Sequence, residues 1–426
     1  MIPTRLAAAA ALLGAAVVAL ALPTVARAEP TASTIVTLRA GDPARAIAAL
    51  ERAHGFRAEH RYTSSVRGFS ARLSARQRDA LRSDPLVASV HDDQAVRLVT
   101  PVAASRRADV PTGVRRIGGG AAAASVAVAV IDTGIDLRHP ALNASSGVNC
   151  IAGKRRTSPA QDDHGHGTHV AGTIGAKPGS GVAGVAPGTK LYAVKVLDAS
   201  GMGSVAQVIC GIDWVTANAK RLGIAVANLS FGGPGTSDRD CGVTSGDPLH
   251  EAICRSSEAG VTYVVAAGND GVDLAGAVPA SYPEVLTVTA ISDSDGRAGG
   301  DGRAPSCMAG ERDDAPATFS NYATRVADLS HTVAAPGVCI TSTWPGGRTN
   351  TISGTSMATP HATAVVALCI SSGRCSRDPD RAIRTVIADA QRHATEANGY
   401  EGYDDMRSVR RYGPLVWTVT VRRSPR

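Results

Sequence analysis

Ser356 is the residue whose type and position most directly suggest chemistry. It lies in the segment ISGTSMATPH (352–361), where a helical pattern begins. The first backbone N–H groups of a helix have no partner within it, so a hydroxyl there lies beside donors that can bind an oxyanion as it forms. Serine is also a common N-cap, so capping is the alternative interpretation. The G-x-S-x-G elbow of another hydrolase class is absent, because Ala358 occupies its last position.

His166 is the second candidate. It lies in DHGHGTHVAG (163–172), where glycines flank it and another helical pattern begins. Because glycine has no Cβ, other chain segments can approach the imidazole closely, as proton transfer requires. The alternative is a metal site, since His-x-His-x-x-His resembles the zinc-binding runs of metallohydrolases. That site needs more ligands downstream, and His250, His331 and His361 lie in no matching context.

Asp132 is the third candidate and ends an apolar run in VIDTGID (130–136). Taken alone, it is equally a carboxylate that caps a turn. Together with His166 and Ser356, however, it completes a set of nucleophile, base and orienting carboxylate. The order Asp, His, Ser along the chain is one of the known arrangements of such triads.

The elements that must position these residues follow an alternating pattern. Short apolar runs alternate with helical patterns, which predicts an α/β fold with a mainly parallel sheet and helices on both faces. In such sheets the site lies at the carboxyl ends of the strands. The predicted strands are 126–131, 191–196, 225–230, 261–267 and 285–290. Helices are expected to start near Gly167, Ser204, Pro248, Ser356 and Asp378, with Gly223 and Gly260 as C-terminal stops.

The chain before residue 121 has a different organisation. Residues 1–28 have the basic start, apolar run and small residues of an export signal rather than a membrane anchor. Residues 33–99 predict a small α+β unit, with strands at 35–38, 68–73 and 87–91 and helices at 43–54 and 74–83. Residues 101–120 have the composition of an exposed, cleavable linker.

The charge of the chain argues against a nucleic-acid partner once it is divided along the sequence. The formal net charge is +7, but residues 29–107 hold 13 Arg against eight acidic residues, while 29 residues of each sign follow from Ala108 onward. The basic balance therefore belongs to the first quarter of the chain.

These motifs together resemble the secreted subtilisin-like serine endopeptidases, closest to their proteinase K-like branch. The resemblance covers nearly all of the chain after the signal and implies Ser356 as nucleophile, His166 as general base and then acid, and Asp132 as its orienting carboxylate. The segment VVAAGND (264–270) resembles the one that supplies the oxyanion-hole amide, a role that falls to Asn269. A turn residue is the alternative for Asn269. The other two classes to weigh are a zinc-dependent hydrolase and a non-catalytic peptide-binding relative.

Substrate binding in this family is partly strand addition to two exposed edges. The residues that resemble these edges and the walls of the first specificity pocket are Gly201, Met202, Gly203, Ser230, Phe231, Gly232, Gly233, Ala266, Ala267 and Gly268. None of them is acidic, so we expect apolar or aromatic side chains before the cleaved bond. Cleavage mainly after Arg or Lys would contradict that expectation.

The unit at 33–99 resembles the family's inhibitory propeptide, of the inhibitor I9 type, through HRY (60–62) and GFSARL (68–73). The resemblance implies a signal at 1–28, a propeptide at 29–107 and a peptidase domain at 108–426, with self-cleavage between Ala95 and Asp109. It further implies an extracellular monomer that acts on proteins, binds its own propeptide in cis and has no nucleic-acid or membrane partner. Residues 391–426 carry no recognisable motif.

An even number of cysteines in an exported chain predicts disulfides, and eight cysteines leave 105 pairings open. The resemblance implies Cys150–Cys210, Cys241–Cys254, Cys307–Cys339 and Cys369–Cys375.

The chemistry itself requires no cofactor, but the family suggests structural calcium. Two features argue against family calcium sites: Ala141 replaces a ligand carboxylate, and Lys177 lies in a loop that supplies the oxygens of another site. A further family site would use the carbonyls of Pro283 and Val285 with Asp328, and extra residues around 329–332 can displace the Asp328 carboxylate.

Overall fold

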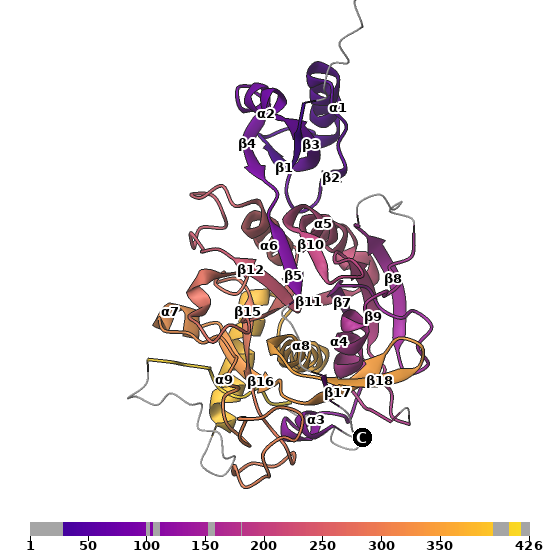
Figure 1. Ribbon diagram of the computed structural model, residues 1–426, viewed down its shortest axis with the longest axis vertical. Helices are drawn as coiled ribbons and strands as arrows, with labels where there is room; N and C mark the ends of the chain where they lie inside the picture. Colours follow the sequence, from indigo (N-terminus) through magenta and orange to yellow (C-terminus); the bar gives the residue numbers. More distant parts are fainter. Residues whose placement is uncertain are drawn as a thin grey trace, which may run out of the picture.

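The structure is a computed structural model that describes residues 29–98, 103–104, 111–151, 158–179, 181–394 and 409–418. The predicted export signal at 1–28 lies outside this part of the chain. A small N-terminal unit lies on one end of a larger α/β unit (Figure 1). None of the helices in the described residues is long and apolar enough to cross a membrane.

A seven-stranded sheet forms the centre of the larger unit, and every pair of neighbouring strands in it is parallel. Its spatial order is β16 (Thr332–Pro336), β15 (Leu286–Ile291), β13 (Thr262–Ala266), β11 (Ile224–Leu229), β7 (Ala127–Asp132), β9 (Lys190–Lys195) and β8 (Asn143–Asn149). The five predicted strands all lie in this sheet, each within about one residue of its expected bounds, so the predicted fold class is confirmed.

Alternation along β7 shows how the two faces of the sheet are covered. Val128 and Val130 belong to one apolar cluster, which holds residues of α4 (His166–Gly175), α8 (Thr355–Ser371) and α9 (Pro379–His393). Ala129 and Ile131 belong to a second cluster with α5 (Val205–Leu222) and α6 (Pro248–Glu258). Successive side chains of a strand point to opposite faces, so one short run contributes to both cores.

Local capping sets where the helices begin. Ser204 and Gln207 form a reciprocal capping box at the start of α5, and the side chains of Asp247 and Asp378 accept backbone N–H groups at the starts of α6 and α9. Gly223 ends α5 with φ 70°, as its predicted stop position requires.

The N-terminal unit consists of an antiparallel sheet and two helices. The sheet order is β2 (His60–Tyr62), β3 (Gly68–Ser74), β1 (Thr31–Leu38) and β4 (Val87–Asp92), and the helices are α1 (Pro43–His54) and α2 (Ala75–Arg82). Val36 and Leu38 pack in the unit's own core, whereas Ile35, Tyr62 and Val66 join the α5–α6 cluster of the larger unit. The two units therefore share buried apolar surface.

Strand β5 (Ala95–Leu98) leaves the N-terminal unit and lies between β10 (Met202–Ser204) and β12 (Phe231–Pro234) of the larger unit (Figure 1). Both pairings are antiparallel. Further along, the backbone of β6 (Ala103–Ala104) pairs with β18 (Arg348–Ile352), which also pairs with β17 (Ile340–Trp344). The short elements that remain are β14 (Ala277–Val278), paired with β12, α7 (Val326–Leu329) and a 3₁₀ turn at Leu274–Gly276.

The prediction of an exposed linker over residues 101–120 was wrong for its second half. Helix α3 (Thr112–Arg116) lies there, and Val114 and Ile117 are buried in the core. Composition missed this because only two apolar side chains are needed to anchor such a short helix among small residues. Residues 409–418 also pack against the fold, since the Val416 N–H donates to the carbonyl of Ala334 in β16.

Candidate active site

Asp132, His166 and Ser356 come together at the carboxyl end of the central sheet. Asp132 is the last residue of β7, His166 the first of α4, and Ser356 the second of α8. All three are fully buried in this structure. Their convergence at the strand ends agrees with the position expected from the alternating pattern.

His166 and Asp132 form a buried pair. The Nδ1 atom of His166 lies 2.8 Å from Oδ1 and 3.0 Å from Oδ2 of Asp132. A carboxylate can only accept, so Nδ1 of the neutral ring carries the hydrogen and Nε2 is left with the lone pair. The Thr133 N–H also donates to Asp132 Oδ1, at 2.7 Å. The arrangement presents His166 Nε2 as a base.

Two glycines allow this close approach. A Cβ on Gly167 would lie 2.0 Å from the carbonyl oxygen of Gly134 and 3.2 Å from Asp132 Cβ. Gly165 has φ +116°, and a Cβ there would lie 2.3 Å from the ring of Trp344. A side chain at Gly167 would clash with the end of β7 and the turn after it, and one at Gly165 would clash with Trp344 of β17, so both glycines have a steric reason.

Ser356 Oγ donates a hydrogen bond of 2.7 Å to the carbonyl of Ser230, and Ser230 Oγ donates one of 3.0 Å to the carbonyl of Ser356. His166 Nε2 is buried without a hydrogen-bond partner in the described part of the chain. The hydroxyl must therefore turn away from Ser230 before it can give its proton to His166. Sequence reasoning did not anticipate this serine–serine contact.

Asn269 follows β13 and faces the start of α8. Its Oδ1 atom accepts hydrogen bonds from the Thr355 backbone N–H at 2.8 Å and from Thr355 Oγ1 at 2.7 Å. These two donors fix which end of the amide is the oxygen, so Nδ2 remains as a donor beside the N-terminus of α8. Thr355 is a positioning residue that the sequence analysis missed, although it directly precedes Ser356.

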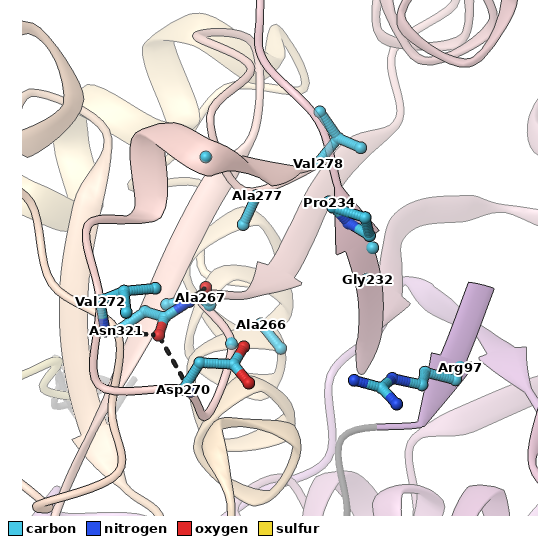
Figure 2. Close-up of a pocket in the computed structure, with 13 residues that line it drawn as sticks. Arg97, Gly232, Pro234, Ala266, Ala267, Asp270, Val272, Ala277, Val278 and Asn321 are labelled. Atoms are coloured by element: carbon cyan, nitrogen blue, oxygen red, sulfur yellow. Dashed lines mark hydrogen bonds between the residues drawn. The ribbon is translucent and has the colours of Figure 1, made fainter. Parts of the chain in front are cut away.

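A pocket of about 330 Å³ opens between the β12 edge and the end of β13 (Figure 2). Of the residues predicted for substrate binding, Gly232, Gly233, Ala266, Ala267 and Gly268 line it. Gly201, Met202, Gly203, Ser230 and Phe231 lie outside this wall: Met202 and Gly203 pair with β5, as does Phe231, and Gly201 accepts the Leu98 N–H at 3.0 Å.

An acidic residue also lines this pocket. Figure 2 shows the carboxylate of Asp270 directed into the pocket, with the guanidinium of Arg97 extending toward it from β5. The Asp270 N–H donates to Asn321 Oδ1, at 3.1 Å, which holds the loop. The sequence analysis did not include Asp270 among the pocket residues, although it directly follows Asn269 in the segment 264–270.

The N-terminal unit binds the larger unit through polar contacts as well as apolar ones. Asp213 of α5 accepts three backbone N–H groups, from Thr63, Ser64 and Ser65, at 2.6–2.9 Å. In return, Asp93 Oδ1 accepts the Ala206 N–H near the start of α5 at 2.9 Å. These carboxylates satisfy backbone donors that the separated units would expose to water.

The histidines of the proposed zinc run do not converge. His166 Nδ1 is hydrogen-bonded to Asp132, and His169 Nε2 is hydrogen-bonded to the Ile340 carbonyl oxygen, at 3.0 Å. Burial lowers the pKa of His169 to about 3, so it is a neutral packing residue. Within the described ranges, no group of potential ligand atoms that lie within 4.8 Å of one another includes these histidines.

The residues considered for calcium at Pro283, Val285 and Asp328 do not fit an ion. Asp328 is buried, and its carboxylate is bound by Arg239 at 3.0 Å and by Arg325 at 2.6 Å. An ion there would have to displace a guanidinium group, which already supplies the compensating positive charge.

Disulfides join Cys150–Cys210, Cys241–Cys254, Cys307–Cys339 and Cys369–Cys375, the pairs that the resemblance implies. Cys369–Cys375 closes a short loop at the end of α8, and Cys307–Cys339 joins the loop after β15 to the chain before β17. Cys369–Cys375 therefore restrains the end of the helix that carries Ser356, and Cys307–Cys339 restrains the residue that precedes β17.

Comparison with known proteins agrees with this architecture. Residues 123–407 match the model of the subtilase family, and residues 29–99 match that of peptidase inhibitor I9. The chain is 38% identical to alkaline serine protease ver112 of Corniculantispora psalliotae over 72% of this chain and 73% of the relative. It is 39% identical to M-protease of Shouchella clausii, over 70% and 68% respectively.

Solved structures give the same result. A cold-adapted subtilisin-like serine proteinase is 28% identical, covers 74% of this chain and 100% of its own, and has a TM-score of 0.54. Fervidolysin from Fervidobacterium pennivorans, at 24% identity and a TM-score of 0.65, shares the fold over 92% of this chain and 60% of its own. The chain belongs to the subtilase family and is a subtilisin-type serine endopeptidase with an N-terminal I9 propeptide.

Proposed function

We propose that this chain is an exported zymogen that cleaves its own propeptide and then hydrolyses proteins through Ser356, His166 and Asp132. One observation carries the proposal: strand β5 of the propeptide lies between β10 and β12 as a substrate would, and the chain continues to β6, beside β18, which ends four residues before Ser356. A peptide held on both edges is directed at that serine.

In the proposed reaction, Ser356 Oγ turns from the Ser230 carbonyl toward His166 Nε2 and gives up its proton as it attacks the scissile carbonyl carbon. The carbonyl oxygen becomes an oxyanion that accepts from Asn269 Nδ2 and the Ser356 N–H. Asp132 stabilises the imidazolium, which then protonates the leaving amine as the C–N bond breaks. Water, deprotonated by the same imidazole, hydrolyses the acyl-enzyme and restores Ser356.

Asn269 is expected to act on the transition state rather than on binding. Asn269→Leu should lower kcat about 10²–10³-fold with little change in KM, because the donor is needed only when the oxyanion forms. Thr355→Val is the matched control: it removes the hydroxyl that donates to Asn269 Oδ1 and accepts the Gly268 N–H, but it keeps the backbone donor to Asn269, so it should have a much smaller effect. Steady-state kinetics on a peptide anilide test this. If Asn269→Leu instead raised KM by a similar factor and left kcat unchanged, Asn269 would have a role in binding.

Self-cleavage is proposed to fall within residues 99–102. These residues connect β5 to β6 in the sequence, and both of those strands pair with strands of the larger unit, so we expect the cut between them. The wild-type precursor should acquire a new N-terminus at residue 100, 101 or 102, whereas Ser356→Ala should remain uncut. N-terminal sequencing checks this. Cleavage of both proteins at the same bond would mean that another protease matures the chain.

The proposed specificity combines an apolar first pocket with Asp270 inside it. Apolar or aromatic side chains should be preferred before the cleaved bond, because Ala266, Ala267 and the two β12 glycines form the wall. Asp270→Asn should reduce kcat/KM for substrates with Arg at that position about fivefold, the size of a partly solvated charge interaction, and leave Phe substrates unchanged. A paired-substrate assay measures the ratio. An unchanged Arg-to-Phe ratio would remove Asp270 from specificity.

The apolar 1–28 segment, the disulfides and the relatives' relationship to subtilisins support export to an oxidising, extracellular location. The proposed catalytic steps use protein groups and water and need no cofactor.

A further inference from the structure

The loop between β15 and α7 brings together three aspartates that have no part in the proposed reaction. Asp293, Asp295 and Asp313 each place a carboxylate oxygen within 4.8 Å of the others. Oxygen ligands lie about 2.4 Å from Ca²⁺, so two ligands of one ion can be separated by at most about 4.8 Å. The spacing therefore fits a single shared cation.

Most of the neighbouring oxygens already accept hydrogen bonds. Asp313 Oδ1 accepts from the N–H and Oγ of Ser294, at 2.7 and 2.8 Å, and its Oδ2 accepts from the Gly302 N–H, at 2.8 Å. Asp295 Oδ1 accepts from the Arg297 N–H, at 2.8 Å. These bonds hold the carboxylates in fixed positions near one another.

Asp293 gives the independent indication that a ligand is missing. Its side chain is completely buried, and Oδ1 accepts the Gly296 N–H at 3.0 Å, but Oδ2 is buried with no hydrogen-bond partner in the described ranges. A buried carboxylate oxygen without a partner is costly unless a proton or a cation compensates it.

The described contacts of the nearby arginines do not include Asp293 Oδ2. Arg116 is buried and donates to Asp314 Oδ1 at 2.8 Å, while its Nε atom stays 4.0 Å from Asp293 Oδ1. Arg115 bonds only the backbone carbonyl of Asp295, at 3.4 Å, among its described contacts. Among the described contacts, no arginine side chain bonds the carboxylate of Asp295 or Asp313.

We propose that Asp293, Asp295 and Asp313 form a calcium site that fastens this loop to the start of the peptidase unit. Carboxylate oxygens in a flexible loop are the ligand class that Ca²⁺ prefers. The loop already contacts α3, since Thr112 Oγ1 donates to the Asp293 carbonyl at 3.2 Å. An ion here would stabilise α3, the first described helix after the propeptide strand. This site is separate from Asp328, whose carboxylate is bound by two arginines.

The test uses the full-length Ser356→Ala precursor, freed of metal with chelator and titrated with CaCl₂ in a calorimeter. Asp295→Asn is the main variant, because Asp295 is only half-buried and its amide can keep the Arg297 contact. Asp313→Asn is the second variant, and Asp301→Asn, an exposed aspartate of the same loop, is the matched control. Thermal unfolding with and without calcium is measured on all four proteins.

The parent and Asp301→Asn should bind calcium and gain Tm with it. Asp295→Asn and Asp313→Asn should each lose one binding event or bind at least about tenfold more weakly, because affinity follows the number of charged ligands. Equal calcium binding and equal Tm gain in all four proteins would overturn the proposal, as would a parent that binds no calcium and so keeps Asp293 protonated instead.

Discussion

Ser356→Ala is expected to lower kcat for peptide hydrolysis about 10⁶-fold, a magnitude known for the nucleophile of a subtilisin. The variant lacks the oxygen that is proposed to form the acyl bond, while the Asn269 amide and the cleft remain. Some acceleration over water should therefore persist. The measurement needs mature enzyme, and Ser356→Ala is not expected to remove its own propeptide. Wild type and Ser356→Ala should therefore both carry a recognition site for another protease within residues 105–110, and the cleaved propeptide should be removed before the assay.

Ser353→Ala is the matched control for this experiment. Ser353 is a buried serine three residues away, and its Oγ accepts the Cys339 N–H at 2.9 Å. Its loss should reduce stability, since an N–H loses its partner, and leave kcat within about tenfold of wild type. Similar losses of kcat in both variants would mean that the chain around the start of α8 is sensitive to any change and that Ser356 has no special role.

Asp132→Asn is expected to lower kcat about 10⁴-fold without removing any reacting atom. In the wild-type protein, the Asp132 carboxylate accepts a hydrogen bond of 2.8 Å from His166 Nδ1, which leaves Nε2 free to act as the base. An amide in its place can present its NH₂ group to Nδ1, which then becomes the acceptor and moves the ring hydrogen to Nε2. The imidazole would keep its position but could not take the serine proton.

Asp136→Asn provides the comparison, because Asp136 is also a buried aspartate of the same segment but bonds Gly346 and Gln161 rather than His166. Backbone and side-chain donors hold the pKa of Asp136 below its usual value even though burial opposes them, so its loss should lower stability. Kinetics and thermal unfolding of both variants separate the two effects. A kcat near wild type for Asp132→Asn would exclude the tautomer role.

Much of the central sheet could be predicted from sequence because its strands are buried on both faces. The run before Asp132 is apolar throughout, since alternate residues face α4 and α8 on one side and α5 and α6 on the other. Strand β8, at 143–149, was missed for the opposite reason: it lies at the edge of the sheet and contains Asn, Ser and Gly. Edge strands need less apolar character, so their pattern is weak.

The sequence could predict which residues form the candidate site, because the chemistry restricts their types. It could not predict how side chains rotate or how distant loops pack, because these depend on the folded geometry. The motifs point to Asp132, His166, Asn269 and Ser356, because each supplies a functional group with few substitutes. The turn of Ser356 Oγ toward the Ser230 carbonyl depends on a side-chain rotation, and the burial of Asp293 depends on a long loop folding back against α3. Neither is encoded in a local pattern.

The measurement that most directly tests the central claim is the mapping of a fluorophosphonate adduct on the mature wild-type enzyme. This reagent reacts with a serine whose hydroxyl is activated by a neighbouring base. The account predicts one adduct, on the peptide that contains Ser356, with labelling lost in Asp132→Asn in parallel with kcat. An adduct on another residue, or an enzyme that cleaves protein at full rate without being labelled, would contradict it.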